Sequence, residues 1–137
     1  VEQASALGRA CAKAIQESGK RVVLVASHSL SHRHFVEEAP LPEDMSREHI
    51  YNHSQYVWDM KIIEMMREGK SREVIDIMPE FTEQTIAETE GGGLIWMLAA
   101  MGFPNFPAEI YGYQSVIGTG NVVACWDPND ETREYVL

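Results

Sequence analysis

Histidine and serine side chains are concentrated in one short stretch of the chain, from Ser27 to His34. Three histidines lie there, namely His28, His32 and His34. Imidazole is a common metal ligand, and it is also the side chain best suited to carrying protons near neutral pH. The stretch therefore indicates either a metal site or an acid–base site. The competing interpretation is that histidines in a loop are simply exposed polar side chains.

Two carboxylates, Glu88 and Glu90, lie beside the glycine run Gly91 to Gly93 in an otherwise apolar neighbourhood. A bound metal ion would explain acidic groups in such a place. The alternative is that they complement the dipole of the following helix, which stabilises a helix by a few tenths to ~1 kcal/mol per group. A phosphate on the glycine run is disfavoured, because two adjacent carboxylates would repel it.

The elements that must position these residues begin with a helix and a strand. Apolar residues at helical spacing predict a helix over residues 4–17, which Gly19 ends. The β-branched run Val22 to Val25 predicts a strand buried on both faces. The histidines follow its carboxyl end, which is where open α/β sheets bind ligands. The acidic residues 37–44, with two prolines, predict a surface loop.

The rest of the chain predicts more helix and then a β-hairpin. Two β-type runs, residues 110–117 and 121–126, are separated by Gly118 to Gly120 and predict the hairpin. We therefore expect an α/β fold with a central mixed sheet flanked by helices. The sheet looks incomplete without more chain, since three strands are few for so many helices. The further helices are expected over residues 45–67, from Ser71 to a point before Pro79, over 82–87 and over 94–101.

Composition speaks against several classes of partner. The 137 residues include 21 acidic and 11 basic side chains, for a net charge of −10. Nucleic acids and anionic membranes bind positive surfaces, so neither is expected as a partner. The longest apolar stretch, residues 91–103, is well short of the ~20 residues that cross a bilayer. Cys11 and Cys125, without a CxxC motif, fit buried thiols in a reducing cytoplasm.

Three motifs in a fixed order carry a resemblance to a known family. They are residues 27–32 (SHSLSH), residues 87–93 (AETEGGG) about 55 residues later, and residues 118–121 (GTGN). Together they resemble the C-terminal half of the catalytic subunit of class III extradiol ring-cleaving dioxygenases. The chain looks closest to those that cleave 2-aminophenol, with homoprotocatechuate 2,3-dioxygenases as near relatives. The resemblance spans nearly the whole chain, which opens on Val1. It implies that residues 1–137 are the C-terminal portion of a catalytic domain whose N-terminal half is absent.

The resemblance implies an Fe(II) site made of two histidines and one glutamate, with positions left open for an aromatic substrate and O2. Both histidine ligands of the family come from the N-terminal half, so they are expected outside this chain. Glu88 matches the glutamate ligand, with Glu90 in reserve, because spacing does not separate the two. His32 matches the acid–base histidine. His28 and His34 are expected to contact the substrate or to support the site.

The function that the resemblance implies is cleavage of the ring of 2-aminophenol or a catechol with O2, giving a product of the muconic semialdehyde type. His32 would take a proton from the substrate and return it later. A hetero-oligomer with a related noncatalytic subunit is also implied. Two alternatives stay open. The residues alone fit a zinc or binuclear metal hydrolase, and the chain could be a noncatalytic paralogue, although the presence of both His32 and Glu88 argues against the latter.

Overall fold

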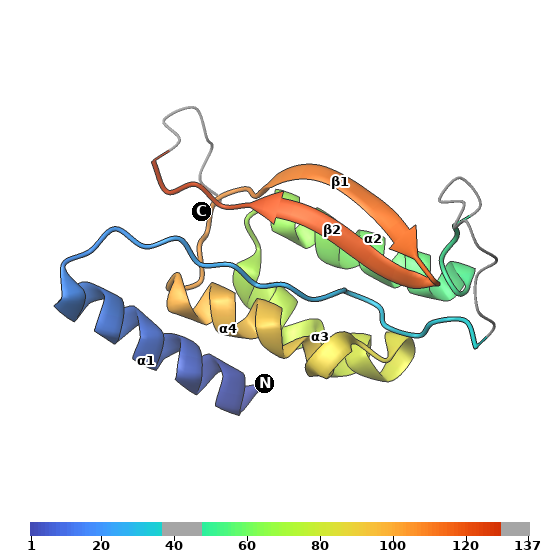
Figure 1. Ribbon diagram of the computed structural model, residues 1–137, viewed down its shortest axis with the longest axis horizontal. Coiled ribbons are helices and arrows are strands. Elements are labelled where there is room, and N and C mark those ends of the chain that lie inside the picture. The colour runs from blue at the N-terminus through green and yellow to red at the C-terminus, as the bar shows by residue number, and fades with distance from the viewer. Residues whose placement is uncertain (37–47, 130–137) are drawn as a thin grey trace.

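The computed structural model describes residues 1–36 and 48–129. The expected α/β fold is confirmed, with helices packed against a two-stranded antiparallel sheet. In Figure 1, α1 lies along α4, and the hairpin of β1 and β2 covers α2. The elements are α1 (Glu2–Ser18), α2 (His53–Arg67), α3 (Ser71–Thr85), the short 3-10 helix η2 (Glu88–Gly91), α4 (Gly92–Ala100), β1 (Glu109–Val116) and β2 (Thr119–Cys125).

The predicted hairpin is present, with a tighter turn than the glycine pattern suggested. Ile117 and Gly118 both have positive φ, 46° and 93°, so they form a two-residue turn whose twist matches the strands. Positive φ is unusual for a β-branched residue. Two backbone hydrogen bonds from other segments stabilise the turn. The Phe35 amide donates to the Ile117 carbonyl (2.9 Å), and the Tyr51 amide donates to the Gly118 carbonyl (2.9 Å).

The strand expected at Val22 to Val25 is not formed. The segment is extended between α1 and the histidine-rich stretch (Figure 1), yet its backbone makes no hydrogen bond with any described residue. Val23 and Val25 are 86% and 73% exposed, whereas burial on both faces was predicted. A strand needs a neighbouring strand for its backbone groups, and within the described residues β1 and β2 pair only with each other.

Helix α3 continues through Pro79, which corrects the prediction that a helix ends before this residue. Proline has no amide proton, so the carbonyl of Ile75 loses its usual helical donor. Val74, Met78 and Phe81 are all at most 1% exposed and lie on the same side of the helix. Burial of these side chains on both sides of the proline keeps the helix continuous, so one helix replaces the two that were expected over residues 71–87.

Helix α2 begins later than predicted, at His53 rather than near residue 45. The Asn52 side chain accepts a hydrogen bond from the Gln55 amide (2.8 Å), which is a normal helix N-cap. The loop predicted at residues 37–44 and the start of the predicted helix at 45–47 lie outside the described residues. Cys125, the last residue of β2, is exposed rather than buried as predicted.

The hydrophobic core lies between α2, α3 and α4, under the hairpin. Leu30 from the histidine-rich stretch is buried in it, which brings that stretch onto the core. No helix in the described part of the chain is both long and apolar enough to cross a membrane. The core residues that are 2% exposed or less include Ile62, Ile63, Met66, Val74, Met78, Phe81, Ile95 and Leu98.

We expect Gly8→Val to lower the free energy of unfolding, because α1 packs directly on α4 at this residue. A Cβ atom at Gly8 would lie 2.4 Å from the Trp96 carbonyl oxygen and 2.7 Å from the Ala99 Cβ. Overpacking of this kind costs about 1–3 kcal/mol. Gly112→Val in β1 is the control, since a Cβ there meets no atom within 4 Å. Urea unfolding curves test this, and equal midpoints for the two variants would contradict the packing.

Candidate active site

The histidine-rich stretch forms one wall of an open pocket of about 400 Å³. Segment 27–34, η2 and the tip of the hairpin meet there. Four of the five predicted site residues line the pocket, although Glu88 is distant in sequence from the three histidines. The lining residues are Ser27, His28, Ser29, His32, His34, Glu88, Val116, Ile117, Thr119 and Asn121.

A chain of hydrogen bonds joins Glu88, Ser29 and His32. The amide and the hydroxyl of Ser29 both donate to Glu88 Oε2, at 2.5 and 3.0 Å. Ser29 Oγ also lies 2.6 Å from His32 Nδ1. Because the serine hydroxyl has one proton and gives it to Glu88, Nδ1 of His32 must be the donor in the second contact. The neutral imidazole therefore carries its proton on Nδ1, and Nε2 is the basic nitrogen.

These contacts keep Glu88 ionised. The hydrogen bond from the Ser29 amide is the largest cause that lowers the pKa of Glu88 below 4.5, and the Ser29 hydroxyl and the neighbouring His32 and His28 lower it further. Partial burial acts in the opposite direction. His32 Nδ1 lies 3.7 Å from Glu88 Oε2, so a protonated His32 would form an ion pair with it. Among the described residues only Oε2 is engaged, which leaves Oε1 for another ligand.

The turn that presents Glu88 is strained. Ile86, Thr89 and Glu90 all have left-handed φ, between 51° and 55°. Each such non-glycine residue costs of order 1–3 kcal/mol, and such residues cluster at functional sites. The Glu88 amide donates to the Leu30 carbonyl (3.4 Å), which ties the turn to the histidine-rich stretch. With this backbone Glu88 lines the pocket, whereas Glu90 is exposed and is not part of the lining.

His34 and His28 flank the central pair in different ways. His34 is exposed, and its ring meets that of His32 edge to face, with centroids 5.3 Å apart. His28 Nδ1 lies 2.6 Å from the Ser29 carbonyl oxygen, so this nitrogen carries the proton. The His28 ring packs over Gly93, where a Cβ would lie 2.6 Å from its Cδ2 atom. Close packing of this ring therefore explains one glycine of the glycine run.

A second, buried cluster was missed from the sequence. Asp59 of α2 accepts hydrogen bonds from the Ser31 amide (3.0 Å), the Ser31 hydroxyl (2.7 Å) and the Tyr113 hydroxyl (2.6 Å). Burial raises the pKa of Asp59 above 3.8, although all three hydrogen bonds oppose the rise. Burial, and then the Asp59 carboxylate, raise the pKa of Tyr113 well above its usual value, so its hydroxyl stays a donor.

The sequence does hold a signal for this cluster. Asp59 follows Gln55 by four residues and precedes Ile62, Ile63 and Met66, all of which are buried on one face of α2. A carboxylate on the buried face of a helix requires donors from elsewhere in the fold. Such a position is a candidate for a structural or functional cluster even before its partners are known.

The described residues do not by themselves complete a metal site. No group of three or more histidine, cysteine or acidic side chains suited to one ion occurs within residues 1–36 and 48–129. Glu88 supplies one ionised carboxylate beside two imidazoles. Any three-ligand site here would need donors from outside these residues.

We expect Ser29→Ala to raise the pKa of Glu88 towards 4.5, because the substitution removes one hydrogen bond that favours the carboxylate. The Ser29 amide remains, so the rise should be partial. A pH titration of the glutamate carboxyl signals by ¹³C NMR measures it. Ser27→Ala is the control, since Ser27 lines the same pocket without a hydrogen bond to Glu88. An unchanged Glu88 titration in Ser29→Ala would contradict this account of the chain.

The chain is similar in sequence to ring-opening dioxygenases. Residues 1–124 match the family described as the catalytic LigB subunit of aromatic ring-opening dioxygenase. The 2-aminophenol 1,6-dioxygenase beta subunit of a Pseudomonas species is 53% identical over 121 residues, covering 88% of this chain and 40% of that protein. The 3,4-dihydroxyphenylacetate 2,3-dioxygenase of Escherichia coli is 26% identical over 105 residues, covering 77% of this chain and 37% of that protein.

The chain therefore spans about two fifths of the length of these relatives. The match nevertheless covers most of the chain, including the histidine-rich stretch, the turn that carries Glu88 and the hairpin. It confirms the resemblance to extradiol ring-cleaving dioxygenases. The chain belongs to the LigB family of aromatic ring-opening dioxygenase catalytic subunits.

Proposed function

We propose that this chain provides the carboxylate ligand and the acid–base histidine of a non-haem Fe(II) extradiol dioxygenase, which opens the ring of 2-aminophenol or a catechol with O2. The observation that carries the proposal is the hydrogen-bonded chain of Glu88, Ser29 and His32 on the wall of an open pocket. The relative that is 53% identical is named for 2-aminophenol, which makes 2-aminophenol the first substrate to test.

Fe(II) suits the donors that are present. Two histidines and one carboxylate are a common ligand set for this ion in oxygen-activating enzymes. Glu88 is held ionised and keeps Oε1 free of the described hydrogen bonds, so it would hold the ion as the single carboxylate. Two histidines from outside residues 1–137 would complete the set. When bound, the ion supplies the redox chemistry by which O2 reacts with the ring.

The residues of this chain would manage protons and orientation. Nε2 of His32 is the free base and would take the proton of the substrate hydroxyl group. Ser29 keeps the proton of the neutral ring on Nδ1. The Glu88 carboxylate, 3.7 Å from Nδ1, would stabilise the imidazolium until His32 returns the proton to the reacting substrate in a later step. Val116 and Ile117 offer an apolar wall for the aromatic ring.

Two other functions are weaker on these observations. A zinc or binuclear metal hydrolase fits the donors, but the family is one of ring-opening dioxygenases. A noncatalytic paralogous subunit has no need of an ionised glutamate beside a histidine in an open pocket, and this chain has both. Dependence of the activity on O2 distinguishes the proposed dioxygenase from a metal hydrolase. Turnover of the aromatic substrate distinguishes it from a noncatalytic subunit.

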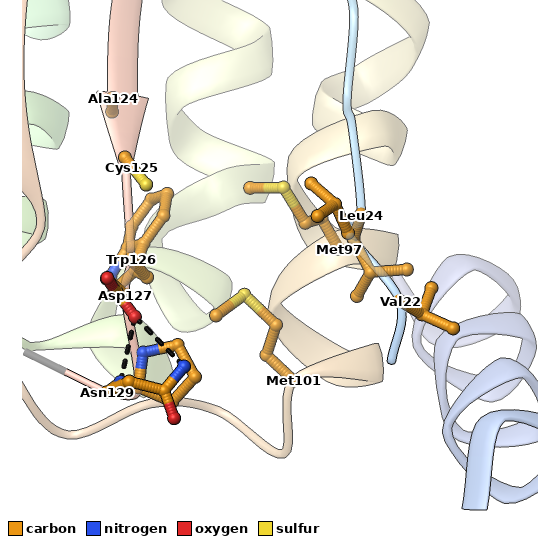
Figure 2. A pocket seen from close by; sticks show the side chains of 11 residues that line it. Val22, Leu24, Met97, Met101, Ala124, Cys125, Trp126, Asp127 and Asn129 are labelled. Atoms are coloured by element: carbon orange, nitrogen blue, oxygen red, sulfur yellow. Dashed lines mark hydrogen bonds between the residues drawn. The ribbon is translucent and has the colours of Figure 1, made fainter. Parts of the chain in front are cut away.

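We also propose that residues 1–137 are the C-terminal portion of a larger catalytic domain, which works with a related noncatalytic subunit. Support comes from the segment Val22 to Val25, whose backbone lacks a partner strand among the described residues. An open groove of about 450 Å³ lies beside it. Figure 2 shows Met97 of α4 and Met101, the residue after α4, pointing across this groove towards Trp126. The buried Nε1 of Trp126 has no hydrogen-bond partner among the described residues.

One further feature fits this larger assembly. The chain spans about two fifths of the length of its relatives, so they have ample sequence to supply strands for the sheet. We also propose that the enzyme is cytoplasmic, because Cys11 and Cys125 are both free thiols and a reducing compartment keeps thiols free.

We expect His32→Ala to lower kcat for 2-aminophenol by about 10²–10⁴-fold with unchanged iron content, because proton transfer by a positioned group contributes that much. Glu88→Ala should instead lose iron. The complete protein is loaded anaerobically with Fe(II), and O2 uptake, the yellow ring-opened product and iron per chain are measured. His53→Ala, an exposed histidine on α2, is the control.

Each contrary outcome has a defined meaning. Full turnover by His32→Ala would remove the acid–base role from this residue. Undiminished iron in Glu88→Ala would move the ligand to Glu90 or elsewhere. Activity without O2 would favour the hydrolase, and an iron-loaded wild type without ring cleavage would favour the noncatalytic subunit.

We expect the amides of residues 22–26 to exchange hydrogen slowly in the complete protein, because pairing with a further strand would protect them. Hydrogen–deuterium exchange with mass spectrometry measures the rates by peptide. The amides of residues 113–115 in β1 serve as a protected reference. Exchange of residues 22–26 at the rate of an unstructured peptide would show that no strand is added there.

A further inference from the structure

Asp59 is a buried acid that the proposed reaction does not use. It is 0% exposed, and among the described residues no basic side chain pairs with it. Its Oδ1 atom accepts from the Ser31 amide, and its Oδ2 atom accepts from the hydroxyls of Ser31 and Tyr113. A buried carboxylate is costly unless it is fully hydrogen-bonded, so a side chain in this position needs an explanation beyond packing.

The partner of Asp59 is the residue directly before His32. Ser31 is clamped on its other side by the hairpin, where the Gly120 amide lies 3.0 Å from the Ser31 carbonyl oxygen and 3.1 Å from Ser31 Oγ. The Leu30 amide donates to the Gly120 carbonyl (2.8 Å). Asp59 therefore holds the segment from the side of α2, while Gly120 holds it from the side of β2.

The cluster has no room to rearrange. A Cβ atom at Gly120 would lie 1.8 Å from Asp59 Oδ2 and 2.5 Å from the Tyr113 hydroxyl. Ser31 is 0% exposed, so water cannot replace a lost partner without opening the packing. Three donors converge on Asp59, and a carboxylate accepts all of them because it has no proton to place. An asparagine would put an NH2 group against at least one of these donors.

From this arrangement we infer that Asp59 is a positioning residue for His32. By fixing Ser31 it also fixes His32, the next residue, and Ser29, two residues before. Ser29 Oγ therefore stays 2.6 Å from His32 Nδ1. Asp59 itself is not among the residues that line the pocket. The inference rests on the proposed function only in that His32 is taken as the acid–base group.

The test compares Asp59→Asn with Glu64→Gln in the complete Fe(II)-loaded protein. Both variants remove one carboxylate from α2, but Glu64 is 60% exposed and pairs with Arg67, whereas Asp59 is buried. Two measurements are made at one pH. The first is kcat and KM for 2-aminophenol, and the second is the ¹⁵N NMR shift of the two His32 ring nitrogens in the metal-free protein, which reports the tautomer.

We expect Asp59→Asn to lower kcat by about 10–100-fold with KM changed less than about twofold, since a displacement near 1 Å at a reacting group can cost ~10²-fold. The Nδ1 shift of His32 should move away from that of a protonated ring nitrogen. Iron content should stay the same, and Glu64→Gln should match the wild type in every measurement.

The outcomes separate the inference from the proposed function. If Asp59→Asn is folded and keeps both its kcat and its His32 shifts, the inference is wrong, even if the variant melts at a lower temperature. If the wild type shows no ring cleavage, the proposed function fails, and the His32 shifts alone decide the positioning role. If Asp59→Asn does not fold, Ser31→Ala removes a single hydroxyl from the cluster, and wild-type kcat and shifts in that variant overturn the inference.

Discussion

The stretch from Ser29 to His32 lacks regular secondary structure, so its backbone hydrogen bonds must come from other elements. Buried amides and carbonyls without partners are rare in native proteins. Here the partners come from β2 at Gly120, from α2 at Asp59, from the end of α3 at Thr85 and from η2 at Glu88. The site lies where these four elements meet, and none of them could shift independently without breaking one of these bonds.

The same arrangement gives two carboxylates opposite environments. Glu88 is 31% exposed at its side chain and receives donors that lower its pKa, so it offers a negative charge to the pocket. Asp59 is buried, and its pKa is raised despite three donors. The two acids lie on either side of one short segment of chain. In our proposal the accessible acid holds the ion and the buried acid holds the backbone, which is a division of work set by solvent exposure.

Local features of this protein were predictable because local sequence determines them. Helix α1 and the hairpin followed from residue types. The grouping of His32 with Glu88 joins distant parts of the chain, and it followed only from the family resemblance. What failed depended on distant contacts. Val22 to Val25 has the composition of a strand, but a strand needs a neighbouring strand to pair with, and the described residues supply none for this segment. Pro79 lies within a helix because the core on both sides of it outweighs one lost hydrogen bond. Which of Glu88 and Glu90 lines the pocket depends on left-handed backbone angles, which the sequence pattern does not determine.

The hairpin turn shows how stability and activity can oppose each other at one residue. Ile117 has a backbone conformation that suits asparagine or glycine far better than a β-branched side chain. Its side chain also lines the pocket beside Val116. A designer who optimised this protein for heat resistance would replace Ile117 early, and the replacement would remove apolar surface from the wall that we assign to the aromatic ring. A screen for thermostability alone would therefore favour substitutions that weaken the pocket wall proposed to contact the substrate.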